Sequence, residues 1–217
     1  LPNALDRSIT GGNYNYQFQE SLEVPRHQHL ARIDVRPSPK DAIYGRFSTW
    51  YADNQGFAVP AGAANWGLLG QHYTFKDASL ILNYTRTLSS SVVNELSVGY
   101  RHSTEAGSAL TQEGLDAVTR NNIGYTLGQF SPSINPLNII PSASFTGAIA
   151  NPAAITFEGR FPLTGADTFV TVNDTASLAR GDHTFKAGFY LEHARNEEGK
   201  TGTFNGNFEY NVDSVNP

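Results

Sequence analysis

The stretch that decides the fold is residues 80–102, LILNYTRTLSSSVVNELSVGYRH. In its second half, Leu96, Val98 and Tyr100 fall on one face of a strand, and the polar or small residues between them fall on the other. Side chains alternate between two faces in a β-strand, so this period predicts a strand rather than a helix. The turn Ser89-Ser-Ser91 separates it from a similar first half, which predicts a β-hairpin.

The same period recurs along most of the chain. Further alternating segments occur at residues 14–18, 31–36, 43–51, 78–87, 168–179, 183–194 and 203–211. One residue departs from the pattern, because Asp174 stands on the otherwise apolar face of its segment. Helical periodicity is almost absent, and several segments exceed the roughly 5–6 residues of typical soluble strands. The predicted fold class is therefore all-β and antiparallel.

The connections between these segments are of two kinds, which alternate along the chain. Tight polar turns are predicted at residues 37–41, 89–91 and 180–182. Long loops are predicted at residues 53–71 and at about 104–167, with a shorter one at 196–202. This alternation places all tight turns at one end of the sheet, as in up-and-down transmembrane β-barrels with short periplasmic turns and long extracellular loops. It predicts a barrel segment of roughly seven or eight strands.

The composition argues against several classes of partner and site. The 217 residues include 15 Lys and Arg against 20 Asp and Glu, a net charge of −5, which argues against a nucleic-acid partner. The chain has no Cys, so disulfides and thiolate zinc sites are excluded. No apolar run is long enough for a transmembrane helix. Because the chain starts at Leu1 and has no Met, we expect it to be an internal piece of a longer protein.

Four parts of the sequence resemble, in order, barrel strands of Oar-like TonB-dependent receptors. The first is His27-Gln-His-Leu-Ala-Arg-Ile-Asp-Val35 with Lys40-Asp-Ala-Ile-Tyr-Gly-Arg-Phe-Ser48. The second is Leu82-Asn-Tyr-Thr-Arg-Thr-Leu-Ser89 with Val93-Asn-Glu-Leu-Ser-Val-Gly-Tyr100. The third runs from Val172 through Arg180-Gly-Asp-His-Thr-Phe-Lys-Ala-Gly188, and the fourth is Gly202-Thr-Phe-Asn-Gly-Asn-Phe208. The turn around Arg180 is the most specific of these matches.

This resemblance implies that residues 1–217 are a partial outer-membrane β-barrel domain in contact with outer-membrane lipid. Such receptors resemble barrels of about 22 strands closed by an N-terminal plug domain. The chain has no string similar to the plug or to a TonB box. We therefore expect the plug and the other strands outside it, with TonB reached through the missing N-terminal part.

The implied function is energy-coupled uptake of a large or scarce solute. Two alternatives remain open at this stage. One is a small self-contained outer-membrane barrel with a structural or adhesive role, and the other is a secreted β-sandwich that binds a ligand. The sorting of short turns and long loops favours a barrel over the sandwich.

We expect no catalytic, metal or cofactor site. The sequence has no Gly-x-Ser-x-Gly elbow, phosphate-binding loop or dinucleotide fingerprint. The adjacent Glu197 and Glu198 are interpreted as solvated loop charge. His27 and His29 share a strand face, but a stable metal site needs a third and a fourth ligand. They are interpreted as residues of the barrel rim.

The polar faces of the strands are the candidate lumen surface. Charges of both signs are costly in lipid, but they are stable in a wet lumen against a polar plug. These charged side chains either form ion pairs between neighbouring strands of the wall, or they contact the plug or a solute. The candidate lumen-facing residues are Arg32, Asp34, Arg36, Arg46, Glu95, Arg101, Lys186, Glu192 and Glu209.

Aromatic residues of the long loops are the candidate solute contacts. An aromatic ring stacks on a flat or ring-shaped ligand such as a sugar, or packs the loop on itself. The candidate loop contacts are Phe57, Trp66, Tyr125, Phe130 and Phe145.

Overall fold

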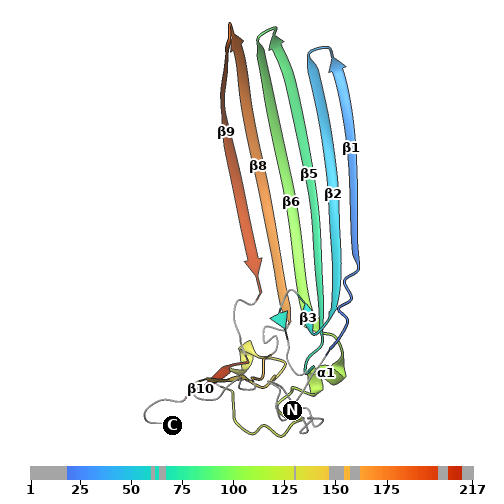
Figure 1. Cartoon of the computed structure of the whole chain (residues 1–217), viewed down its shortest axis with the longest axis vertical. Coiled ribbons are helices and arrows are strands. Elements are labelled where there is room, and N and C mark those ends of the chain that lie inside the picture. The colour runs from blue at the N-terminus through green and yellow to red at the C-terminus, as the bar shows by residue number, and fades with distance from the viewer. Residues whose placement is uncertain are drawn as a thin grey trace, which may run out of the picture.

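The computed structural model describes residues 19–59, 62–63, 67–129, 131–146, 154–156, 162–199 and 205–211. Within these ranges most residues lie in strands (Figure 1). The long strands are β1 (Arg26–Ser38), β2 (Asp41–Gly56), β5 (Gln71–Ser89), β6 (Val92–Ala109), β8 (Leu163–Arg180) and β9 (His183–Glu198). The short elements are β3 (Ala58–Val59), β4 (Gly62–Ala63), α1 (Gln112–Asp116), η1 (Pro132–Ile134), β7 (Ser142–Thr146) and β10 (Asn207–Asn211).

The six long strands form one sheet in the order β1-β2-β5-β6-β8-β9. Every neighbouring pair is antiparallel. The order in the sheet is also the order in the chain, so each strand pairs with the next long strand. The strands have 13 to 19 residues, more than the about 9–11 that cross a bilayer at a tilt. In the described part of the chain the sheet is open, with β1 and β9 at its edges (Figure 1). The predicted all-β, up-and-down architecture is confirmed.

Among the residues that the structure describes, the sheet contains six of the roughly seven or eight strands expected. The alternating segment at 14–18 lies outside the described residues. The segment at 203–211 yields β10, which pairs in parallel with β7 in a separate two-stranded sheet. There Tyr210 stacks on Phe145, with ring centroids 4.9 Å apart. The prediction that Glu209 lies on the barrel wall is therefore wrong, because alternation identifies a strand but not its partner.

The three hairpin turns lie at one end of the sheet, as predicted (Figure 1). Each has two residues between the last paired positions, which are Ser38 with Asp41, Ser89 with Val92, and Arg180 with His183. Gly181 has a φ of 58°, a left-handed conformation that glycine adopts without a steric cost. A glycine at the first turn residue suits the tight hairpins that match the twist of the strands.

The pairing register arranges the side chains in rows across the sheet. One row contains Ile33, Gly45, Leu82, Val98, Val172 and Leu191. The adjacent row, on the opposite face, contains Arg32, Arg46, Ile81, Gly99, Thr171 and Glu192. We call the face of the first row the apolar face and the face of the second row the polar face.

The long connection is shorter than expected. Strands β6 and β8 run to Ala109 and from Leu163, so the connection spans residues 110–162 rather than about 104–167. The strand extensions are rich in small and polar residues on both faces, such as Ser103 and Gly107. Apolar alternation therefore cannot reveal these extensions. They are recognised as strand only because the backbone of β6 pairs with β5 and with β8 over this length.

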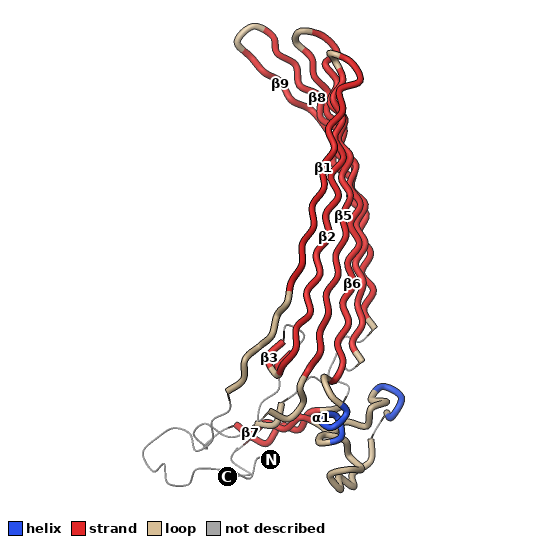
Figure 2. Tube along the Cα trace, turned by 90° about the vertical axis from the view of Figure 1, so that its right-hand side faces the viewer, coloured by secondary structure: helices blue, strands red, loops and turns tan. Residues whose placement is uncertain are grey.

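Residues 110–129 and 131–146 of this connection, together with residues 205–211 after β9, form what we call the loop module. It contains α1, η1, β7 and β10 and lies at the end of the sheet opposite the turns (Figure 2). The module packs on the end of the sheet through one buried core, in which its Val118 and Ile139 meet Leu69, Tyr73 of β5 and Leu163 of β8. Among the described residues no helix is long and apolar enough to cross a membrane.

Candidate functional site

The apolar face exposes large hydrophobic side chains along all six strands. Ile33 is 70% exposed, Leu191 63% and Phe189 57%. On β9 the apolar positions run from Phe185 to Leu191, roughly 20 Å at the rise of a strand. A band of this height is close to the roughly 25 Å apolar belt of transmembrane barrels. An exposed apolar surface of this extent indicates a lipid or protein partner.

Polar and aromatic residues border this band on the side of the loop module. His29 and His102 lie in one row of the apolar face, which ends at Arg195. In the next row, Lys76 stands 6.0 Å from the ring centroid of Tyr51. Amphipathic rings and long cationic side chains are favoured where a bilayer meets water. His29 thus lies at the border of the band, in agreement with its interpretation as a rim residue.

A second polar group borders the band on the side of the turns. Tyr84 donates its hydroxyl proton to Asp41 at 2.7 Å, and Arg86 donates to the Tyr84 hydroxyl at 3.2 Å. Next to it, the Asn94 amide donates to the Asp174 carboxylate at 2.8 Å. This bond accounts for Asp174, whose break in the alternation had no explanation in the sequence. Its partner lies on the neighbouring strand, 80 residues away.

The pair predicts a double-mutant result in detergent micelles. Asn94→Leu lowers the free energy of unfolding by about 1–3 kcal/mol, because it leaves the Asp174 carboxylate without its donor. The double variant Asn94→Leu with Asp174→Leu recovers most of that loss, since both polar groups are then gone. Denaturant unfolding followed by tryptophan fluorescence measures both. Equal losses in the single and double variants would contradict a direct interaction.

The polar face carries the predicted lumen residues. Of the nine candidates, Arg32, Asp34, Arg46, Glu95, Arg101, Lys186 and Glu192 share this face by register, and Arg36 follows by alternation. Glu209 lies instead on β10 in the loop module. Several of the charges are paired within the wall. Arg32 binds Asp34 with distances of 2.7 and 2.9 Å and lies 4.1 Å from the Tyr44 ring centroid.

A shallow groove of about 360 Å³ lies on this face between β5, β6, β8 and β9. Arg101 and Glu192, both predicted, line it together with Phe169 and Thr171. Arg101 also forms an ion pair with Asp77, and its guanidinium lies 5.9 Å from the Phe169 ring centroid. The sequence analysis missed Asp77 and Phe169, because only the register brings them to Arg101.

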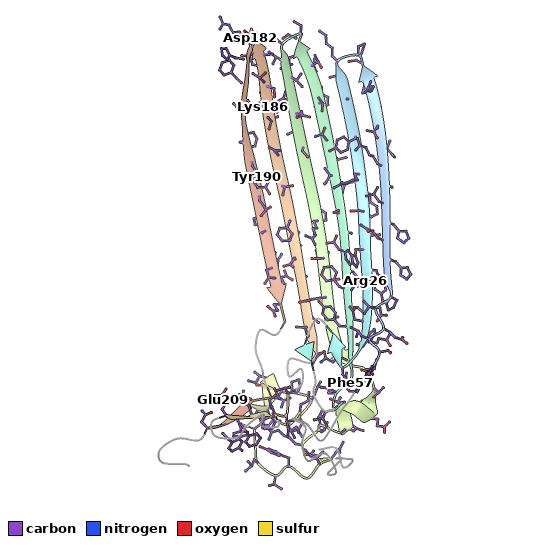
Figure 3. The ribbon with its side chains drawn as sticks, in the orientation of Figure 1. Arg26, Phe57, Asp182, Lys186, Tyr190 and Glu209 are labelled. Carbon is purple, nitrogen blue, oxygen red and sulfur yellow. The ribbon has the colours of Figure 1, made fainter. Side chains whose placement is uncertain are left out.

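Four candidates on the polar face have no ion-pair partner and no side-chain hydrogen bond among the described residues. Arg36, Arg46, Glu95 and Lys186 are exposed and form no ion pair with any residue that the structure describes. Figure 3 shows Lys186 on β9, between the turn at Asp182 and Tyr190. These side chains are therefore available to a polar partner on this face of the sheet.

The aromatic residues predicted as loop contacts do not form one cluster among the described residues. The Phe57 N–H donates to the Glu20 carboxylate at 2.9 Å. The Tyr125 ring centroid lies 4.8 Å from the Arg120 guanidinium carbon, and both residues line a cavity. Phe145 stacks on Tyr210. Trp66 and Phe130 lie outside the described residues. No group of His, Asp and Glu that could hold a metal ion is found in the described part of the chain.

A family model described as "Outer membrane beta barrel domain" matches residues 1–216. No curated protein and no solved structure matches the chain.

Proposed function

The chain belongs to the family of outer membrane beta barrel domains, and from that premise we propose that it is part of a TonB-dependent receptor of the Oar-like type. Its location is the bacterial outer membrane, where lipid covers the apolar face. The receptor takes up a large or scarce solute with energy supplied through TonB. This chain contributes wall strands and extracellular loops, and no catalytic chemistry.

The observation that carries the proposal is the set of uncompensated charges on the polar face. Arg36, Arg46 and Lys186 are cationic and Glu95 is anionic, and all four are exposed. A polar plug domain inside the barrel supplies partners for both signs, because a folded protein surface carries acids and bases together. This distribution supports a plugged receptor over a small barrel whose interior is filled by its own side chains.

The orientation follows from the ends of the sheet. Outer-membrane barrels have short periplasmic turns and longer extracellular loops. The three tight turns of this chain therefore face the periplasm, and the loop module faces the outside, where a solute first arrives. A secreted sandwich needs a second sheet over the apolar face, and none is found there within the described residues.

Site-specific photo-crosslinking tests the inner contact. A photoreactive residue in place of Lys186, in the full-length protein in outer membranes, is expected to crosslink to peptides of the plug domain. The same residue in place of Leu191, on the opposite face of β9, is expected to crosslink to lipid alone. Mass spectrometry of the crosslinked peptides reads both. Plug peptides from the Leu191 variant, or none from the Lys186 variant, would contradict the proposal.

Retention on the purified periplasmic domain of TonB tests the energy coupling. The full-length protein is expected to be retained, and a version that starts at Leu1 is expected to pass through. If both versions behave alike, the coupling to TonB is wrong, whereas the assignment to an outer-membrane barrel is unaffected.

A further inference from the structure

The loop module contains a cavity of about 310 Å³. One wall comes from the connection after α1, with Arg120, Tyr125 and Leu127, and the opposite wall comes from residues 205–208 at the start of β10. These two segments are about 80 residues apart in the chain, but both lie at the loop end of the molecule (Figure 1). The volume is near the lower end of the range for small-molecule sites, which suits a single ring-sized unit.

Arg120 places an uncompensated positive charge at this cavity. The residue is only 7% exposed. Its Nε donates to the Ile139 carbonyl at 3.3 Å, its Nη1 donates to the Leu127 carbonyl at 2.7 Å, and its guanidinium stacks on Tyr125. No described residue that lines the cavity is acidic. A buried cation is costly without an anion nearby, so the site favours a negatively charged group.

Asn205 also lines the cavity and carries a buried side-chain amide. The residue is 3% exposed, and its Nδ2 donates to the Ile140 carbonyl at 2.7 Å. That bond fixes the amide, and the Asn205 Oδ1 is buried without a hydrogen-bond partner among the described residues. Buried polar atoms are rarely left unpaired in folded proteins. The wall of the cavity therefore contains an unsatisfied polar group.

The remaining walls suit the faces of a ring. Tyr125 and Phe208 contribute aromatic rings, and Leu127 and Ile134 contribute aliphatic surface. The C–H faces of a sugar ring pack on such surfaces, while its hydroxyls need amide and hydroxyl partners. Gln129 and Asn207 supply amide groups at the same cavity.

We propose that this cavity binds one ring of an acidic sugar. The sugar carboxylate pairs with Arg120, and the ring packs against Tyr125 and Phe208. The site lies on the extracellular side of the sheet and captures the solute before uptake. As a capture site it rests on the proposed transport function, although the binding itself does not require TonB or a plug.

Calorimetric titration of the full-length protein in detergent tests the ligand class. Glucuronate is expected to bind about tenfold or more tightly than glucose, because a charge-assisted bond to Arg120 adds at least that factor. Equal binding of the two sugars would overturn the acidic class, and no heat from either would overturn the site. Since the titration needs neither TonB nor a plug, its failure is distinct from a failed crosslink or a failed TonB retention.

Two pairs of variants locate the binding. Ser131→Glu adds a competing negative charge at the cavity and is expected to weaken glucuronate about tenfold, whereas Ser131→Gln leaves it within about twofold. Glucose affinity is expected to be the same in both. Phe208→Ala is expected to weaken both sugars, while Tyr210→Ala, two residues further on the same strand, leaves both unchanged. Equal effects of the two members of either pair would overturn this location.

Discussion

Arginine in place of Val98 is expected to lower the free energy of unfolding in lipid vesicles by about 2–4 kcal/mol. Val98 lies in the middle of the apolar face on β6, opposite Leu82 on β5 and Val172 on β8. It is 39% exposed, and lipid covers that exposed part in the membrane. An arginine there brings a charge into the hydrocarbon layer, where water cannot solvate it.

The matched control is Ser97→Arg, one residue earlier on the same strand and on the opposite face. Ser97 shares its row with Asn83 and Asn173, so the new guanidinium meets polar side chains and water. The expected change is within about 0.5 kcal/mol, as for ordinary surface substitutions. Reversible denaturant unfolding in vesicles measures both. If Ser97→Arg is the more damaging variant, the two faces are assigned the wrong way round.

Alanine in place of Ile139 is expected to unfold the loop module while the sheet stays intact. Ile139 is 0% exposed and belongs to the core with Val118 and Leu69. Its N–H donates to the Asn135 side chain at 3.2 Å, and its carbonyl accepts from Arg120. Removing a buried isoleucine side chain costs about 2–5 kcal/mol, and a small module with one core has little stability to spare.

Limited proteolysis of the membrane-inserted protein reads this effect. Cleavage within residues 110–146 is expected to accelerate in Ile139→Ala, and the strands are expected to remain protected. Ile123→Ala is the control, because Ile123 is 46% exposed and its truncation leaves no cavity. Rapid cleavage of the wild type in this region, at the rate of Ile139→Ala, would show that the module is not folded in the membrane.

The polar face shows how far the sequence could predict the site. Alternation alone assigned Arg32, Arg46 and Glu192 to one face, and the register places them in a single row. It failed for Glu209, because the same period occurs in any strand, whatever sheet the strand joins. It also missed Asp77, whose pairing with Arg101 depends on a register that no local pattern contains.

The loop cavity was beyond sequence reasoning for a similar reason. Tyr125 was identified as a candidate contact, but Arg120 and Asn205 were not. These two residues lie on segments far apart in the chain. Only the folded module buries both of them and leaves the charge of one and the acceptor of the other unmatched. A single charged residue in a loop carries no sequence signal of burial.

By itself the sequence determined that the chain forms long antiparallel strands, that its tight turns gather at one end, and that one face is apolar. These properties are local, since the period of two and the turn residues act over a few neighbouring positions. The tertiary structure decided the number of paired strands, the partner of β10, the pairing of Asp174 with Asn94, and the folding of the long connection around Ile139. Each of these depends on contacts between residues distant in the chain, whose free energy comes from burial and hydrogen bonding that exist only after the segments meet.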